Sequence, residues 1–232
     1  GTAKAVFECR APEVVVSGPA GTGKSLACME KLHMLALLNP GMRGLIVRKT
    51  LTSLGSTALV TWREKVIPEA LTTKLVRFYG GSAEHPPQYQ YRNGSRIMIG
   101  GMDKPSRIMS SEYDIAYAQE ATELTTDDWE AITTRLRHGA VTFQQIIADC
   151  NPDAPHHWLK IRADHGQVLM LESRNEDNPT LFDEAGQLTD RGRDYIAKLD
   201  ALTGVRHARL RRGIWAAAEG IIYEDYAPAV HL

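Results

Sequence analysis

The stretch that decides the fold is residues 14–25, which reads Val14-Val15-Val16-Ser17-Gly18-Pro19-Ala20-Gly21-Thr22-Gly23-Lys24-Ser25. A short run of β-branched residues leads directly into a glycine-rich turn, which is typical of a buried strand that ends in a loop. Residues 26–38 follow with good helix formers and neither Gly nor Pro, until Asn39-Pro40-Gly41 ends the helix. The stretch therefore predicts a strand, a glycine-rich loop and a helix in succession.

The loop matches the phosphate-binding pattern G-x-x-x-x-G-K-[ST] from its first residue to its last. Its glycines let successive backbone N–H groups turn inward toward phosphate oxygens, and the positive end of the following helix adds to the attraction. Lys24 can place its cation on the β- and γ-phosphates, and the Ser25 hydroxyl can ligate Mg²⁺. We therefore expect a nucleoside triphosphate to bind at all eight residues, namely Gly18, Pro19, Ala20, Gly21, Thr22, Gly23, Lys24 and Ser25.

The rest of the chain predicts an α/β fold around a mostly parallel central sheet. Residues 44–48 are typical of a second buried strand, so the loop lies in a βαβ unit, which implies helices on both faces of the sheet. The pair Asn93-Gly94 is the strongest short hairpin signal and predicts a β-hairpin inserted in this core. Further helices are expected over 56–70 and 126–138, and further strands over 75–79, 88–91, 96–99, 115–118, 145–148 and 168–171.

The composition changes near Ser173, where we expect a boundary between two units. Residues 174–186 are polar, residues 189–203 are typical of a helix, and residues 205–212 hold four Arg and one His. These arginines form either a solvated face or a contact for another subunit or for DNA. The boundaries that follow are a core over 1–172, a small second unit over 173–217, and a tail over 218–232 that is too short to fold alone.

Charge and composition exclude several classes of protein. The 232 residues include 27 Lys or Arg and 28 Asp or Glu, so the net charge of −1 excludes a polycation that coats nucleic acid. Any contact with nucleic acid must come from a local basic patch. The three cysteines are widely spaced and indicate buried thiols in a reducing compartment. No apolar run of 18 residues and no signal peptide occurs, so we expect a soluble protein that is not secreted.

A phosphate-loop enzyme needs a carboxylate at the end of a second strand, and two acids compete for that place. Glu120 follows the strand at 115–118, and Asp149 follows the strand at 145–148. We expect Glu120 to be the catalytic base that polarises the attacking water, and Asn151 to sense the γ-phosphate from the end of the next strand. The alternative makes Asp149 the magnesium ligand and Glu120 a surface acid.

An ordered set of short motifs gives the sequence a resemblance to a known family. The set comprises residues 18–25, residues 46–50, Asn93-Gly94, residues 100–108, Gln119-Glu120-Ala121, Cys150-Asn151-Pro152, Asp177-Asn178-Pro179, Gly213-Ile214-Trp215 and residues 220–223. In this order it resembles the large terminase subunit of tailed bacteriophages, the motor that packages DNA into the procapsid. The resemblance covers nearly the whole chain.

The resemblance implies a P-loop NTPase of the additional-strand, catalytic-glutamate type, with ATP and Mg²⁺ as its cofactors. Residues 173–217 would be its small lid subdomain. The family also has a C-terminal nuclease domain, and residues 218–232 would be the start of the linker to it. We therefore expect this chain to be the ATPase part alone, without the clustered carboxylates that a two-metal nuclease needs.

The resemblance also assigns roles to individual residues. Lys24 and Ser25 match the family's phosphate-loop lysine and magnesium ligand, Glu120 matches its catalytic glutamate, and Asn151 matches its γ-phosphate-sensing motif. Arg107 lies where some members supply an arginine finger to a neighbouring subunit. Such a finger typically raises the rate by ~10³–10⁵, so a monomer without it would be nearly idle.

Two positions depart from the family pattern. The usual aspartate before the catalytic glutamate is Gln119 here, so water-mediated support of Mg²⁺ would come from Gln119 or from Asp149. The phosphate loop also lacks the arginine that some relatives carry inside it, which favours a finger supplied in trans.

The function that the resemblance implies is an ATP-hydrolysing motor domain that translocates double-stranded DNA into a procapsid. Its partners would be the DNA phosphate backbone, contacted without base recognition, the portal protein, the small terminase subunit and the procapsid. The chain would work as a homo-oligomeric ring, or exist as a monomer in isolation, in the host cytoplasm at the portal vertex. Two rival functions stay open, namely a helicase-like or recombination ATPase and a regulatory ATP-binding module with little hydrolysis.

Overall fold

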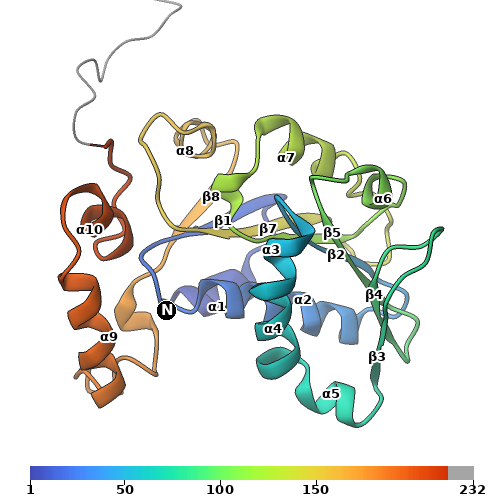
Figure 1. Cartoon of the computed structure of the whole chain (residues 1–232). Helices are drawn as coiled ribbons and strands as arrows, with labels where there is room; N and C mark the ends of the chain where they lie inside the picture. Colours follow the sequence, from blue (N-terminus) through green and yellow to red (C-terminus); the bar gives the residue numbers. More distant parts are fainter. Residues whose placement is uncertain (219–232) are drawn as a thin grey trace, which may run out of the picture.

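An eight-stranded sheet runs through residues 1–218, the part of the chain that this computed structural model describes (Figure 1). The strands lie in the order β3-β4-β5-β2-β6-β7-β1-β8. Each expected strand is present, with ends within two residues of the predicted ones. The strands are β1 (Glu13–Ser17), β2 (Arg43–Arg48), β3 (Val76–Tyr79), β4 (Gln88–Tyr91), β5 (Arg96–Gly101), β6 (Ile115–Ala118), β7 (Gln145–Cys150) and β8 (Leu169–Glu172).

The order of the parallel strands confirms the predicted fold class. β7 lies between β1, which leads into the phosphate loop, and β6, which leads into Glu120. This intervening strand is the additional strand that the resemblance implies. In the parallel register, Val16 of β1 pairs with Asp149 of β7, and Ala118 of β6 pairs with Ala148. The three strands therefore end together at one edge of the sheet.

The predicted hairpin is present, but it is not a separate insertion. β4 and β5 are antiparallel, and Gly94 in the turn between them has φ +86°, a conformation that favours glycine. β5 also pairs in parallel with β2, and β3 adds a further antiparallel strand at the edge. The hairpin therefore extends the main sheet. The sequence identifies the turn but not this second pairing, which joins segments far apart in the chain.

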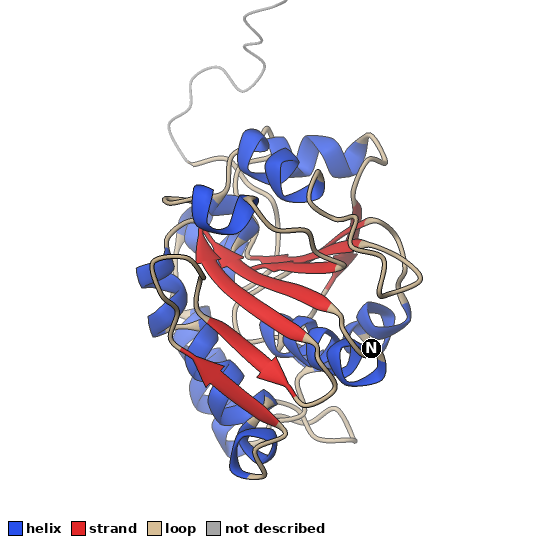
Figure 2. Ribbon diagram, turned by 90° about the vertical axis from the view of Figure 1, so that its right-hand side faces the viewer, coloured by secondary structure: helices blue, strands red, loops and turns tan. Residues whose placement is uncertain are grey.

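Helices cover both faces of the sheet, as expected for a buried parallel sheet (Figures 1 and 2). One core packs α1, α2 and the helical pieces over 51–72 against the sheet, and the other core packs α6, α7 and α8 against the opposite face. The helices are α1 (Thr2–Glu8), α2 (Lys24–Leu38), α3 (Leu51–Ser56), α4 (Ala58–Thr61), a π-helical turn (Trp62–Val66), α5 (Pro68–Thr72), α6 (Ser106–Met109), α7 (Thr126–Thr133), α8 (Trp158–Asp164), α9 (Asp190–Asp200) and α10 (Gly204–Leu210).

The helix predicted over 56–70 is instead a series of short helical pieces. The first piece begins earlier, after Thr50, whose side chain accepts a hydrogen bond from the Ser53 N–H and so caps α3. Pro68 begins α5 rather than ending a helix, because a proline in the first turn removes no helical hydrogen bond. Gly55 lies just before the break between α3 and α4, and Pro68 lies at the break before α5.

The helix predicted over 126–138 ends at Thr133. Beyond it, the Tyr113 N–H donates to the Arg135 carbonyl, and the Arg137 N–H donates to the Tyr113 carbonyl. Because of these backbone bonds, the chain after Thr133 leaves the helix and pairs with the segment that leads into β6.

The residues after β8 form a small helical layer at one end of the sheet (Figure 1). β8 ends at Glu172, and the helix expected over 189–203 is α9. The boundary between two units at residue 173 stays a prediction. Residues 219–232, which include nearly all of the predicted tail, lie outside the described residues. None of the helices within residues 1–218 combines the length and apolar character that a membrane crossing requires.

Asp114 lies directly before β6, at the opposite end of that strand from Glu120. Its carboxylate is fully buried and accepts hydrogen bonds from the backbone N–H groups of Arg43, Ala140 and Val141, and from the His138 ring. Burial alone would raise the pKa of Asp114, but these donors outweigh burial and lower the pKa below its usual value. The residue therefore has a structural role.

We expect the Asp114→Asn substitution to destabilise the fold by about 2–3 kcal/mol at pH 7, because an amide cannot satisfy all of these donors. The measurement is urea unfolding, with Asp194→Asn on the exposed face of α9 as the matched control. Since the folded-state pKa of Asp114 is depressed, its contribution is present above pH ~4 and is lost as the pH falls further. The gap between wild type and Asp114→Asn should therefore shrink in acid, and a gap independent of pH would contradict the assignment.

Candidate nucleotide site

The phosphate loop connects β1 to α2 through two glycines in the left-handed region. Gly21 and Gly23 have φ of +76° and +84°, which residues with a Cβ atom rarely adopt. Gly23 occupies the cap position of α2, so the helix begins at Lys24. The amino-terminal end of α2 therefore points into the loop, as required for an anion site.

The side chain of Lys24 closes the loop from inside. It is 8% exposed, and its amine donates to the carbonyl oxygens of Gly18 (3.0 Å) and Pro19 (2.6 Å). It also lies 3.2 Å from Oδ1 of Asn151, which follows β7. Burial lowers the pKa of Lys24, and the nearby Asp149 carboxylate partly offsets this effect. The structure thus brings the loop cation and the predicted γ-phosphate sensor into direct contact.

Asp149 lies at the loop as well. Its carboxylate accepts hydrogen bonds from the Ser25 hydroxyl and from the Tyr117 hydroxyl, the second at 2.9 Å. Tyr117 is fully buried in β6 and Ser25 lies in α2, so the carboxylate is held from a strand and from a helix. The Ser25 hydroxyl and the Asp149 carboxylate are oxygen donors of the kind that Mg²⁺ prefers.

Glu120 stands at the end of β6 in a strained backbone conformation. Its φ of +51° and ψ of +59° lie in the left-handed region, which a residue with a long side chain occupies only when its surroundings enforce it. Burial raises the pKa of Glu120 to about 7, and the charge of Asp149 adds to this effect, while Lys24 opposes it. Strain and a raised pKa together are typical of functional residues.

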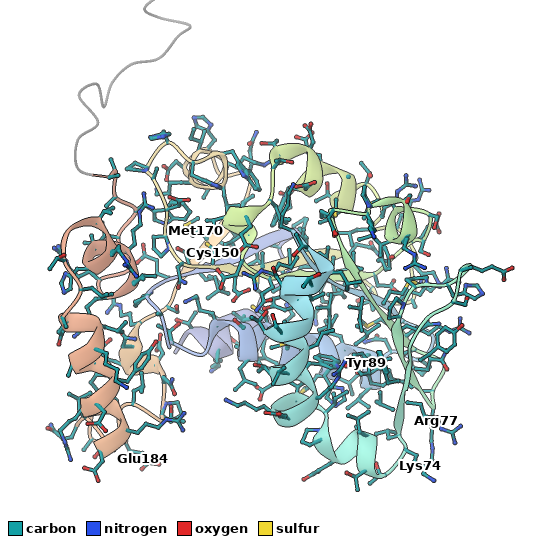
Figure 3. All side chains as sticks on the ribbon, in the orientation of Figure 1. Lys74, Arg77, Tyr89, Cys150, Met170 and Glu184 are labelled. Atoms are coloured by element: carbon teal, nitrogen blue, oxygen red, sulfur yellow. The ribbon has the colours of Figure 1, made fainter. Side chains whose placement is uncertain are left out.

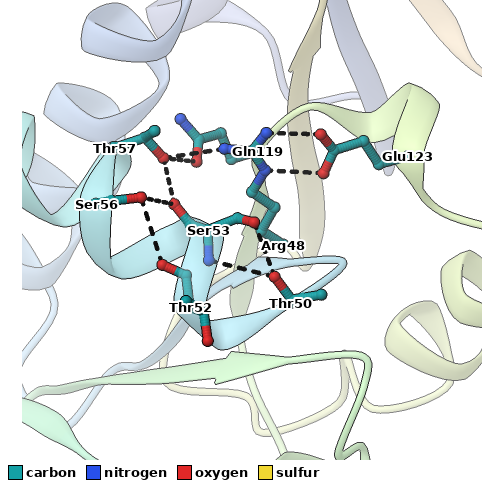
Figure 4. Close-up of polar contacts among 8 residues, drawn as sticks. All are labelled: Arg48, Thr50, Thr52, Ser53, Ser56, Thr57, Gln119 and Glu123. Carbon is teal, nitrogen blue, oxygen red and sulfur yellow. Dashed lines mark hydrogen bonds and ion pairs between the residues drawn. The ribbon is translucent and has the colours of Figure 1, made fainter.

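Gln119 faces away from the loop, although it precedes Glu120 directly. Its Oε1 lies 3.0 Å from the Thr57 hydroxyl (Figure 4). Thr57 in turn accepts a hydrogen bond from Arg48, which forms a two-bond ion pair with Glu123 at 2.6 and 2.8 Å. Arg48 and Gln119 therefore belong to a polar network that fixes the ends of β2 and β6, rather than to the wall of the loop cavity.

One cavity of about 220 Å³ is lined by most of the predicted site residues, but not by Gly18, Pro19, Gln119 or Arg107. Glu120 and Asp149 both line it, so the two acids share one site and Glu120 is not a surface acid. Gln119 is not among the lining residues, and the geometry therefore favours Asp149 over Gln119 as the support for Mg²⁺. The cavity is lined by Ala20, Gly21, Thr22, Gly23, Lys24, Ser25, Leu26, Glu120, Asp149 and Asn151.

Arg107 lies outside this cavity. It is exposed, and its guanidinium donates to the Ser82 carbonyl at 3.0 Å. It lines a second cavity of about 210 Å³, between the 51–52 and 99–104 segments, which shares no residue with the first. Within one chain, Arg107 therefore does not contribute to the loop that carries Lys24.

Residues after β8 form hydrogen bonds with the backbone of the phosphate loop. Sequence patterns do not reveal these contacts. The side-chain amides of Asn175 and Asn178 donate to the carbonyl oxygens of Ala20 (2.8 Å) and Gly21 (2.6 Å). The Ala20 N–H donates to the Leu210 carbonyl at 2.9 Å. The only sequence signal for these contacts is Asn178-Pro179, which predicts a break in the chain rather than a loop contact.

Two further contacts join the same layer to the loop. The Ser173 hydroxyl lies 2.8 Å from that of Thr22, and a Cβ at Gly18 would lie 2.3 Å from Ser173 Oγ. The Trp215 indole donates to the Ser17 hydroxyl at 3.2 Å and lies against the His157 ring. Both aromatic side chains therefore have packing roles here.

Comparison with known proteins decides the family. A family described as phage terminase large subunit matches residues 11–188, well over half of the chain. This chain belongs to the phage terminase large subunit family. The PBSX phage terminase large subunit of Bacillus subtilis (strain 168) is 29% identical to it over 142 residues, which are 61% of this chain and 31% of that protein.

Solved structures share the terminase fold. The large terminase of a thermophilic bacteriophage matches with a TM-score of 0.72 and 17% identity, over 98% of this chain and 56% of that one. The large terminase ATPase domain of Thermus phage P74-26 matches with a TM-score of 0.65 and 14% identity, over 93% of each chain. This terminase chain thus spans about a third of the PBSX protein and about half of the thermophilic bacteriophage's large terminase.

The strain at Glu120 predicts an unusual order of stability between two variants. We expect Glu120→Gly to be more stable than Glu120→Ala by about 1 kcal/mol, because alanine keeps the left-handed cost and glycine does not. The matched control is Glu130 in α7, where Gly should be less stable than Ala by about 1 kcal/mol. Thermal unfolding of the four variants measures both differences, and the same order at both positions would contradict the strain.

Proposed function

We propose that this chain binds ATP at the phosphate loop and hydrolyses it, as the motor domain of a DNA-packaging terminase. The observation that carries the proposal is the convergence of Lys24, Ser25, Glu120, Asp149 and Asn151 on one cavity in a member of this family. Structures of the thermophilic bacteriophage's large terminase in complex with ADP and with ATP-gamma-S support nucleotide binding at this fold.

Binding would use groups that already point into the loop. The backbone N–H groups at the start of α2 receive the phosphate chain, and the Lys24 amine exchanges the Gly18 and Pro19 carbonyls for phosphate oxygens. Ser25 and Asp149 would hold the Mg²⁺ of the nucleotide, which screens phosphate charge when bound. Within residues 1–218 no cluster of three His, Cys, Asp or Glu side chains forms a metal site alone, and Mg²⁺ usually binds through one or two carboxylates together with phosphates.

Glu120 is the residue that would activate water. As a carboxylate it accepts a proton from the water that attacks the γ-phosphorus, while the bond to the bridging oxygen breaks and ADP leaves. Its burial and the neighbouring Asp149 make it a stronger base than a solvent-exposed glutamate. Asn151 lies beside Lys24 and would hydrogen-bond the γ-phosphate, so that loss of this group is felt at the end of β7.

Residues 173–217 would act as a lid that follows the state of the loop. Asn175 and Asn178 bind loop carbonyls directly, so a change in loop conformation is transmitted to the layer that contains α9 and α10. Arg107 is exposed and does not line the nucleotide cavity of its own chain. It would instead enter the nucleotide cavity of a neighbouring subunit as an arginine finger. ATP would then be hydrolysed at the interface between two neighbouring subunits, and the resulting movements would power a ring of subunits.

The family supports the remaining partners. The ring would translocate double-stranded DNA into a procapsid, together with the portal protein and the small terminase subunit, in the host cytoplasm at the portal vertex. We propose that the nuclease activity of the family lies outside this chain. DNA would be held through its phosphates, since a packaging motor must accept any sequence.

Turnover of ATP tests the central proposal. We expect Glu120→Gln to lower kcat by ~10²–10⁴ while nucleotide affinity is retained, because the general base is lost and the loop is intact. Lys24→Ala should instead weaken nucleotide binding by about 1.5–3 kcal/mol, because a charged hydrogen-bond donor is lost. Phosphate release and fluorescent-nucleotide binding measure the two effects, with Lys49→Ala outside the cavity as the control. Unchanged turnover in Glu120→Gln would overturn the assignment.

Mixing two inactive variants tests the finger. Arg107→Ala keeps a complete loop and base, and Glu120→Gln keeps its arginine, so a mixture should regain activity if the arginine acts in trans. A finger typically contributes ~10³–10⁵ in rate, so the gain should far exceed the sum of the separate activities. Lys104→Ala, an exposed cation of the same segment, is the matched control and should keep wild-type turnover. A mixture with purely additive activity excludes the trans role.

A further inference from the structure

A row of arginines crosses the outer strands of the sheet on one face. In the strand register, Arg77 of β3 pairs with Gln90 of β4, Gln90 pairs with Arg96 of β5, and Arg96 pairs with Arg43 of β2. Paired residues on neighbouring strands project to the same face. We call Arg77, Gln90, Arg96 and Arg43 the arginine row.

The arginine row is exposed and carries no counter-charge. Arg43, Arg77 and Arg96 are all exposed, and none of them takes part in an ion pair within residues 1–218. Arg96 and Arg43 lie directly opposite each other, and like charges in this arrangement destabilise a sheet. The row therefore forms no stabilising ion pair within the described residues, and its charges are accessible to an external anion.

No helix covers the arginine row within the described part of the chain. The opposite face of the same strands packs Val76, Tyr89 and Ile97 into the core. On the row's own face, α6 lies over the other end of β5, where Ile108 meets Gly100. Figure 2, which brings the right-hand side of Figure 1 to the front, shows this face of the outer strands turned toward the viewer. The row therefore lies on an open surface.

The surroundings of the row are basic as well. Residues 63–107 hold eight Lys or Arg against four Asp or Glu, although the whole chain has a net charge of −1. Lys74 and Arg92, which flank the row, are also exposed, and Figure 3 shows Lys74 and Arg77 at the outer edge of the molecule. This is the local basic patch that the balanced composition requires of any nucleic-acid contact.

The spacing of the row fits a phosphate backbone. Neighbouring strands lie about 4.8 Å apart, so the three arginines span about 15 Å across four strands. Duplex DNA carries one negative charge for roughly each 1.7 Å along its axis. Guanidinium groups bind phosphates in a planar, two-bond geometry, and the Gln90 amide between them can donate to a phosphate or sugar oxygen.

We infer that the arginine row is a surface that binds the sugar–phosphate backbone of double-stranded DNA. The inference rests on the proposed DNA-translocating function and names the face that meets the DNA. Arg43 and Arg96 are the first residues of β2 and β5, whereas the nucleotide cavity lies at the opposite, carboxyl-terminal ends of the parallel strands. Loss of the row therefore leaves the hydrolytic residues untouched.

The rival surface for DNA is the basic segment over residues 205–212. There, Arg209 is bound to Asp153 and to the Ala216 carbonyl, and Arg211 is bound to Asp200. These two arginines are committed within the molecule, and Arg206 and Arg212 remain exposed. Exposed arginines of α9 and α10 therefore serve as a matched control for substitutions in the arginine row.

Binding of a fluorescent duplex of mixed sequence tests the inference. The double variant R77Q/R96Q is compared with R191Q/R206Q, which removes the same charge from α9 and α10. Affinity is followed by anisotropy from about 50 to 200 mM salt. Loss of two phosphate contacts should reduce the log–log salt slope by about 1.8 and the affinity at low salt by roughly tenfold or more. R77K/R96K, which keeps the charge, should retain most of the slope.

Unchanged affinity and slope in R77Q/R96Q overturn the inference, and so does an equal loss in R191Q/R206Q. ATP turnover of the same variants, measured without DNA, keeps this outcome separate from the proposed function, because all of them should hydrolyse ATP at the wild-type rate. A wild-type chain that binds no duplex at all overturns both the row and the translocation of DNA, while the ATPase assignment is judged by Glu120→Gln alone. Thermal unfolding of R77Q/R96Q at or above the wild-type midpoint shows that the loss is not one of folding.

Discussion

The register of three parallel strands is the constraint on which the site depends. β7 lies between β1 and β6, and the pairing of Val16 with Asp149 sets a carboxylate opposite the Ser25 hydroxyl. A slip of one residue would turn Asp149 to the other face of the sheet. Apolar side chains on both faces of these strands oppose such a slip, because it would exchange the contents of the two cores. The cores thus fix the relative positions of the loop, the base and the Asn151 amide.

The phosphate loop is also held by residues that follow β8. The amides of Asn175 and Asn178 satisfy the carbonyl oxygens of two loop residues, and the Leu210 carbonyl satisfies one N–H. The carbonyls of Ala20 and Gly21 therefore face the residues after β8, whereas those of Gly18 and Pro19 face the Lys24 amine. This division of backbone bonds makes the helical layer part of the support of the loop.

The sequence predicts those parts of the molecule whose signals are local. The loop, the eight strands and the Asn93-Gly94 turn follow from patterns within about ten residues, and the place of Glu120 follows from the strand before it. The choice between Gln119 and Asp149 does not follow, because each comes directly after a predicted strand. Only the contacts in the folded chain show that Asp149 lies at the loop and Gln119 does not. The arginine row is hidden for the same reason, since its members come from four separate strands.

The position of the Lys24 amine has a consequence for the phosphate loop itself. The buried cation has three partners within the chain, namely two carbonyl oxygens and the side-chain oxygen of Asn151. Lys24 thus ties the end of the loop to its beginning, because the Gly18 and Pro19 carbonyls lie at the start of the same turn. The curvature of the loop is therefore set by bonds within the chain, and one side chain acts as the brace of the turn that it follows.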